Sequence, residues 1–223
     1  MTSVYGITDG GQKRTGRDAR VAPRLVIYDP DLTMSLPAAV SAASGMNAIA
    51  HAVEAMYAAG VSPIATAAAG DAISSLGVSL PIIVMDPADA DARAQALRGA
   101  HLAGIALELA TMGLHHKVCH VLGGTFGLPH AETHAVLLPH IVAFNAPAAP
   151  HAMARVAAAL GVPEAAAGLR DLNARLRLPG SLAQLGFKAA DIDRAAELVS
   201  AATYPNPRVA SAADVRAILT AAL

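Results

Sequence analysis

The pattern of apolar and polar positions divides the chain into a short mixed front and a long apolar remainder. Two short apolar stretches, residues 3–8 and 24–28, predict β-strands, and the Gly10-Gly11 turn and a basic stretch separate them. A sheet of two or three strands is too small to be stable in water. We therefore expect these strands to be the end of a larger sheet.

After Asp31 the pattern predicts helices almost throughout. Much of the apolar content is alanine, the best helix former, and prolines lie near several expected helix starts, where no N–H is needed. Ser211 and Asp214 have the spacing of a capping box, with Asp where Glu is usual. The predicted helices cover residues 37–59, 61–77, 87–112, 115–126, 131–144, 148–160, 163–176, 188–202 and 211–222.

Composition narrows the class of protein. The net charge of −1 gives no electrostatic footprint for nucleic acid. Cys119 is the one cysteine, so an intramolecular disulfide is impossible and a reducing cytoplasm fits. Every apolar run of about 18 residues is broken by proline, histidine or charge, and the N-terminus lacks the apolar segment of a signal peptide. We expect a soluble, cytoplasmic protein without a membrane span.

Candidate chemistry gathers in residues 115–140, which hold six of the nine histidines. His116 and His120 are four residues apart and share one face of a helix. Upstream, Asn47 and His51 have the same spacing. Two such pairs on neighbouring helices can converge, and three imidazoles with one oxygen ligand suit a divalent transition metal. For any one histidine, the alternative is a hydrogen-bonded core residue.

Other polar residues in this region have structural interpretations. We expect His115 and His134 to face away from the site, and His140 to cap or pack. Cys119 is interpreted as structural, because neighbours on a helix point about 100° apart and Cys119 cannot easily share a site with His120.

The stretch 123–127, "GGTFG", lacks the spacing of a phosphate loop. We expect it to interrupt a helix with close backbone packing. Lys117 is interpreted as a solvated charge. The basic run of Lys13, Arg14 and Arg17 is either solvated or touches a nucleotide phosphate.

Four stretches carry a family resemblance: "KRTGRDARVAPRLVIYDPDLT", "SGMNAIAHAVEAMYA", "CHVLGGTFGLPHAETHAVLLPH" and "FNAPAAP". They resemble the maleylacetate reductases of the iron-containing (group III) alcohol dehydrogenase superfamily, whose architecture dehydroquinate synthase shares. The resemblance implies a mainly α fold: an all-helical C-terminal domain at 35–223, preceded at 1–34 by the residual strands of a dinucleotide-binding α/β domain. Because the glycine-rich loop is lacking, we expect a truncated chain that does not turn over NADH alone.

The resemblance also implies a function and its residues. The reaction is NADH- or NADPH-dependent reduction of maleylacetate, a dicarboxylate, to 3-oxoadipate in aromatic-compound degradation. The superfamily's metal ligands fall at Asn47, His51, His116 and His130, and a further active-site histidine falls at His120. A cofactor-lining lysine falls at Lys13. The superfamily has aspartate at the first ligand position, so Asn47 removes the only anionic ligand, and iron or zinc is not expected to be required.

An imidazole pocket is therefore the interpretation of this cluster. Hydride addition to the conjugated C=C bond of maleylacetate places negative charge on the ketone oxygen. Hydrogen-bond donors, some of them protonated, would stabilise this charge. We assign His120 as proton donor or orienting residue, and His51, His116 and His130 as the electrophilic pocket. A homodimer is expected from the resemblance.

Two alternative functions stay open. The first is a metal-dependent group III alcohol dehydrogenase, which a tightly held metal would favour. The second is a non-catalytic helical fragment that pairs with another subunit. The preference between NADH and NADPH and the acceptance of chlorinated substrates are not determined by the residues.

Overall fold

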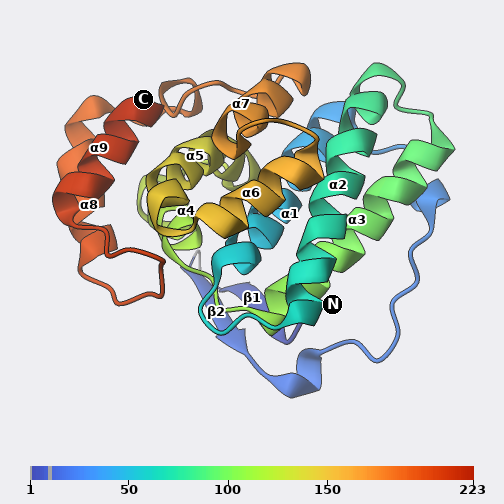
Figure 1. Cartoon of the computed structure of the whole chain (residues 1–223), viewed down its shortest axis with the longest axis horizontal. Coiled ribbons are helices and arrows are strands. Elements are labelled where there is room, and N and C mark those ends of the chain that lie inside the picture. The colour runs from blue at the N-terminus through green and yellow to red at the C-terminus, as the bar shows by residue number, and fades with distance from the viewer. Residues whose placement is uncertain (1, 10–11) are drawn as a thin grey trace.

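The protein is a helical body with a β-hairpin beside it (Figure 1). The computed structural model describes residues 2–9 and 12–223, with the side chains of residues 8, 9 and 12–15 outside the description. The strands are β1 (Val4–Asp9) and β2 (Gln12–Arg17). The α-helices are α1 (Ala38–Tyr57), α2 (Pro63–Met85), α3 (Ala90–Leu109), α4 (Leu114–Phe126), α5 (His130–Asn145), α6 (Pro150–Leu160), α7 (Ala165–Arg175), α8 (Ile192–Ser200) and α9 (Ala212–Ala222). Short 3₁₀ turns lie between some of them.

Two buried clusters form the core of the helical body. The first joins α1 and α2 to residues of α3, α6 and α7. The second joins α4, α8 and α9. Helix α5 contributes to both, with Leu138 in the first and Leu137 in the second. In Figure 1, α8 and α9 lie at one end of the molecule and α2 and α3 at the other, with α4, α5 and α1 between them.

Small residues let the helices of the first cluster approach closely. Gly45 of α1 faces Leu80 of α2, and a Cβ added at Gly45 would meet both δ carbons of that leucine. The absence of a side chain at Gly45 thus lets the two helices pack closely.

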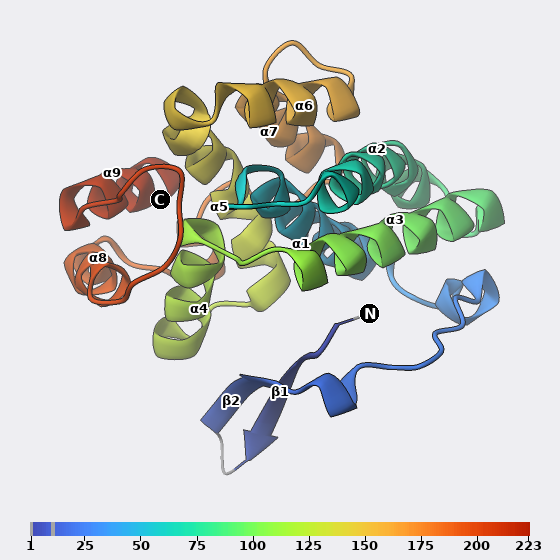
Figure 2. The same ribbon diagram turned by 60° about the horizontal axis from the view of Figure 1, so that its bottom comes forward.

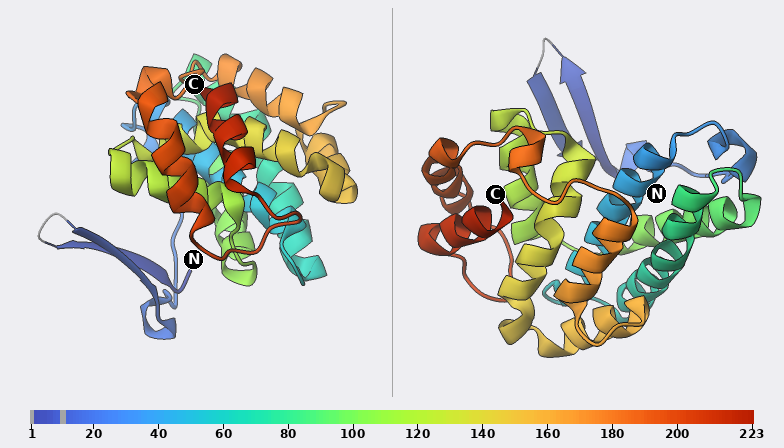
Figure 3. Two further views of the ribbon diagram at one scale, coloured as in Figure 1. Left: turned by 90° about the vertical axis from the view of Figure 1, so that its left-hand side faces the viewer. Right: turned by 90° about the horizontal axis from the view of Figure 1, so that it is seen from above.

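The hairpin lies apart from the helices, as Figures 2 and 3 show. Its strands are antiparallel, with Val4 opposite Arg17. The carboxylate of Glu108, at the end of α3, accepts hydrogen bonds from the Ser3 amide (3.0 Å) and hydroxyl (2.8 Å) and from the Thr2 hydroxyl (3.0 Å). Arg17 lies 3.5 Å from the same carboxylate. One acidic side chain therefore ties both ends of the hairpin to the body.

The prediction of a strand at 24–28 is wrong. This stretch is extended but unpaired, and Leu25 and Ile27 are 76% and 80% exposed. A strand needs a neighbour to bond its backbone, and the described part of the chain offers this stretch none. The second strand lies instead at 12–17, within the basic stretch.

The helix predictions are confirmed in kind and order, with one large difference in length. Helix α2 continues eight residues beyond its predicted end, through Gly77 and Pro81, to Met85. The "GGTFG" stretch does not interrupt α4, which ends at Gly127 in the left-handed conformation (φ +72°). An added Cβ would meet nothing within 4 Å at Gly124, and at Gly123 it would make an ordinary contact of 3.6 Å with the carbonyl oxygen of Leu128, so the expected close packing does not require these glycines.

Two helical stretches have the length and mean hydropathy of a membrane span, Pro63–Met85 and Pro150–Arg175. Half of the apolar window of the first is buried inside the protein, against α1 and α3. The second is two helices, α6 and α7, separated at Gly161. Both stretches therefore contribute to the helical core, which is why they are apolar.

Candidate active site

The histidines predicted from spacing converge where α1, α4 and α5 meet. The ring centroids of His51 on α1 and His116 on α4 are 4.5 Å apart. His120, one turn along α4, lies 6.1 Å from His116 and stacks at 6.4 Å on His130, the first residue of α5. The structure thus brings together the four imidazoles assigned to the pocket.

A cleft of about 440 Å³ opens beside this cluster. It is lined by residues of α3, α4 and the hairpin, with Arg17 and Glu108 among them beside the histidines. The full lining comprises Val4, Arg17, His51, Leu107, Glu108, Leu109, Ala110, Thr111, Met112, His116 and His120. A small polar substrate entering this cleft would meet His120 and His51.

His116 is held by a carboxylate that the sequence analysis did not single out. Its Nδ1 lies 2.5 Å from Oε2 of Glu54, which is 1% exposed. Burial alone would raise the pKa of Glu54, but the hydrogen bond and the charge of His116, with backbone N–H donors, lower that pKa to about 2. Glu54 is therefore ionised at neutral pH and accepts a proton-bearing Nδ1 of His116.

His51 is held by the backbone of its own helix. Its ring donates one N–H to the carbonyl of Asn47, one turn earlier. Burial, together with the neighbouring imidazoles of His116 and His115, lowers the pKa of His51 to about 3. A neutral imidazole has one N–H, so the second ring nitrogen of His51 carries a lone pair.

Four buried polar atoms of these side chains lack hydrogen-bond partners among the described residues: Oδ1 of Asn47, Nε2 of His116, Nδ1 of His115 and Nε2 of His134. An unpaired buried polar atom is costly, and a bound ion or water is one explanation for it. Asn47 and His116 stand at the expected ligand positions. Asn47 Oδ1 can donate an electron pair, and so can His116 Nε2 when the imidazole is neutral with its proton on Nδ1.

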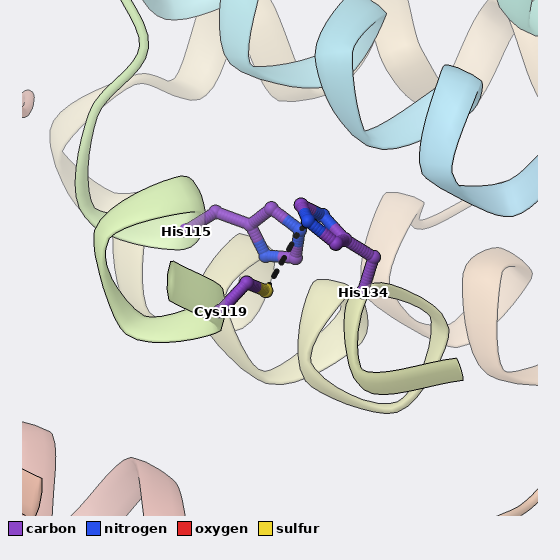
Figure 4. A group of neighbouring side chains, drawn as sticks. All are labelled: His115, Cys119 and His134. Carbon is purple, nitrogen blue, oxygen red and sulfur yellow. Dashed lines mark hydrogen bonds between the residues drawn. The ribbon is translucent and has the colours of Figure 1, made fainter. Parts of the chain in front are cut away.

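A second group of side chains lies behind the cluster (Figure 4). His115 Nε2 is 2.9 Å from His134 Nδ1 and 3.7 Å from Sγ of Cys119. All three side chains are buried, and their potential metal-ligating atoms lie within 4.8 Å of one another. Burial lowers the pKa of His115 to about 3 and raises that of the Cys119 thiol well above its usual value. These groups are neutral, and their polar atoms face one another.

The expectation that His134 faces away is wrong. Its ring lies 4.5 Å from His130 and 4.8 Å from His116. His130 and His134 are four residues apart on α5, which is the same spacing that pairs His116 with His120. That spacing was visible in the sequence.

Comparison with known proteins places the chain in a family. Residues 41–223 match the model of the Fe-containing alcohol dehydrogenase family, C-terminal. The chain belongs to the iron-containing alcohol dehydrogenase family. Maleylacetate reductase of Pseudomonas sp. (strain P51) is 54% identical over 208 residues, which are 93% of this chain and 59% of the relative. Maleylacetate reductase of Burkholderia cepacia is 50% identical over 98% of this chain and 62% of the relative.

A solved structure shows the same fold. The crystal structure of maleylacetate reductase from Agrobacterium tumefaciens has a TM-score of 0.96 and 47% identity, covering 99% of this chain and 63% of that chain. This chain therefore spans 59 to 63% of the length of the relatives named here.

The donor set of this iron-containing alcohol dehydrogenase family member fits a divalent transition metal. One ring nitrogen of His51 is bonded to a backbone carbonyl and one of His116 to a carboxylate, which is the usual support for a metal-bound histidine. Asn47 offers an unpaired amide oxygen. His130 lies at the same junction, 6.4 Å from His120. Asn47, His51, His116 and His130 would hold the ion.

The assignment of this cluster as a pocket of hydrogen-bond donors stays a prediction. Within it, the pKa of His51 is lowered to about 3, so His51 is not a protonated donor at neutral pH. Although Asn47 removes the anionic ligand, Glu54 supplies an ionised carboxylate in contact with His116, outside the ligand positions.

Of the remaining predicted residues, His140 is half-buried on α5. Burial lowers the pKa of its imidazole, and the positive charge of Arg170 lowers it as well. Lys13 lies in β2, and its side chain is outside the described part of the structure. Its assignment to the cofactor stays a prediction.

Proposed function

We propose that the complete protein to which this chain corresponds is a maleylacetate reductase. The supporting observation is the coincidence of 54% identity to a maleylacetate reductase with a histidine cluster that opens on a cleft of small-molecule size. The reaction adds a hydride from NADH or NADPH and a proton to the C=C bond of maleylacetate and yields 3-oxoadipate. The protein acts in the cytoplasm as a homodimer.

A divalent metal would supply Lewis acidity that polarises the ketone conjugated to the reacting bond. Within the chain, His120 is exposed and lines the cleft, so it can move a proton between solvent and substrate. His51 is half-buried and its pKa is lowered to about 3, so it is neutral at neutral pH and orients the substrate without supplying a proton. Glu54 and the Asn47 carbonyl keep the lone pairs of His116 and His51 directed at the site.

The test uses a chimera, in which the first part of the Pseudomonas relative precedes residue 1. We expect it to oxidise NADH in the presence of maleylacetate, followed by absorbance, because the added part positions the nicotinamide. His120→Ala should lower kcat by about 10²- to 10⁴-fold, the usual contribution of a positioned proton donor. His151→Ala, an exposed histidine on α6, is the matched control and should leave kcat unchanged.

A chimera that binds NADH but leaves maleylacetate unreduced contradicts the proposal. Turnover by residues 1–223 alone, at a rate comparable to the chimera, would agree with the activity but contradict the separate expectation that this chain needs the added part.

A metal-dependent alcohol dehydrogenase is the second candidate function. The lone-pair donors of His51 and His116 favour it, since they suit a metal and no substrate group in particular. The same chimera, assayed with small alcohols and NAD⁺ after metal loading, distinguishes the two functions.

A further inference from the structure

Glu54 is a buried carboxylate of α1 that contacts the start of α4, and it is absent from the lining of the cleft. Its two oxygens accept hydrogen bonds from the backbone N–H groups of Gly113 (3.0 Å) and His115 (2.9 Å). The same oxygens accept the Nδ1–H of His116 and, at 3.3 Å, the hydroxyl of Tyr57. Hydrogen bonds of this kind offset the large cost of burying an ionised group.

These contacts make Glu54 the cap of α4. The residue at the capping position, Gly113, has no side chain to satisfy the first N–H groups of the helix. A side chain cannot be added there, because a Cβ on Gly113 would meet the carbonyl oxygen of Pro205. The carboxylate of α1 therefore replaces the missing cap, and its negative charge suits the N-terminal end of the helix dipole.

One carboxylate thus fixes both the backbone and the ring of His116. Because an ionised carboxylate can only accept, the proton of a neutral His116 must lie on Nδ1. The other ring nitrogen, Nε2, is then unprotonated, and it is a buried atom that lacks a partner in the described structure.

We propose that Glu54 is the positioning residue of this site, which holds His116 in the Nδ1–H form and keeps its Nε2 lone pair directed at the position a ligand occupies. The proposal deepens the proposed function, because it assigns the control of a ligand to a residue outside the superfamily's ligand positions. It also explains how the site keeps a negative charge beside it although Asn47 is neutral.

The first test reads the tautomer directly in the metal-free chain of 223 residues. With ¹⁵N-labelled histidine, the NMR shifts of the His116 ring should show a protonated Nδ1 and an unprotonated Nε2. In Glu54→Gln, the amide can present its NH₂ group to Nδ1, so a substantial population should move its proton to Nε2. Glu197→Gln removes the same charge from an exposed site on α8 and should leave the His116 signals unchanged.

The second test measures Zn²⁺ affinity by calorimetry. Glu54→Gln should weaken binding by about 10- to 100-fold, as expected when the partner of a metal-bound histidine is removed. Glu54→Asp keeps the charge and should restore part of the affinity, whereas a purely structural cap would not separate the two variants in this way.

Several results overturn the proposal. A protonated Nε2 in the unmodified chain does so by itself, whether or not any variant folds. An unchanged tautomer in a folded Glu54→Gln variant does so as well. Neither readout uses maleylacetate or NADH, so a failure of the proposed reaction and a failure of the Glu54 assignment remain distinguishable.

Discussion

At the scale of single residues, Asn47 determines how tightly the site can hold a cation. Its amide oxygen is buried and unpaired at the cluster, and it is neutral. Because this oxygen is neutral, the imidazoles supply most of the affinity for a cation. Glu54 acts on the cation only through its hydrogen bond to His116.

We expect Asn47→Asp to tighten binding of iron or zinc. A unit charge about 4 Å from a cation contributes roughly 1 kcal/mol when water surrounds the pair and roughly 4 kcal/mol near a protein surface. This corresponds to about 5- to 1,000-fold in Kd. The measurement is metal content after dialysis against a chelator, with Asn47→Ala as the control that removes the oxygen. Near-stoichiometric metal retained by the unmodified chain would show that the amide oxygen suffices.

At the scale of helices, the close approach of α1 and α2 depends on Gly45. A side chain at this position would push against both δ carbons of Leu80, which is itself buried. We expect Gly45→Ala to lower the free energy of unfolding by about 1 to 3 kcal/mol, the usual cost of overpacking. Denaturant unfolding checks this.

Gly124→Ala is the matched control for that substitution. Gly124 is also helical, but an added Cβ there meets nothing within 4 Å. Replacing this glycine should be neutral or stabilise by up to about 1 kcal/mol, since alanine favours the helix. Equal effects of the two substitutions would mean that packing at Leu80 is not limiting.

The start of α9 carries the predicted capping box, and the structure confirms it. Ser211 Oγ accepts from the Asp214 amide, and the Asp214 carboxylate accepts from the Ser211 amide at 2.9 Å. Ser211→Ala should cost about 1 kcal/mol and lower Tm by roughly 2–4 °C. Thr220→Ala, exposed near the end of the same helix, is the control.

The same box predicts a pH dependence. The Ser211 side-chain and backbone hydrogen bonds lower the pKa of Asp214 below its usual value of 3.8. A carboxylate with a lowered pKa stabilises the fold fully above its usual value, and this contribution is lost as pH falls through the lowered pKa. The Tm difference between Ser211→Ala and the unmodified chain should therefore shrink below pH 3.8 and stay constant above it.

At the scale of the whole molecule, Glu108 fastens the hairpin to the helical body. Its carboxylate accepts from Ser3 and Thr2 and lies near Arg17. Glu108→Gln should speed amide hydrogen exchange at Ser3, because the amide side chain cannot accept all of these bonds at once. An unchanged exchange rate at Ser3 would mean that Glu108 does not hold the hairpin to the helical body. Glu197→Gln is the control for the loss of one negative charge.

The sequence predicted the positions of the helices well, but not the hydrogen bonds that hold the site residues. Helix starts were visible from local proline and capping signals, and the histidine pairs from their spacing of four. The strand at 12–17 was missed because "QKRTGR" has no apolar alternation, and the stretch at 24–28 has the residues of a strand but no partner. Glu54 was missed because its donors, Gly113 and His115, are about sixty residues away in the chain.

The two core clusters meet at the histidines, since His51 belongs to a helix of the first and His116 to a helix of the second. A ligand that bridges these helices binds strongly only while the two clusters are packed against each other. Because the ligand binds only this packed state, it stabilises it. An ion at this junction would thus couple the two halves in unfolding. With the metal stripped, hydrogen exchange should divide the molecule into two units of unequal protection. With the ion bound, the two units should open together as one.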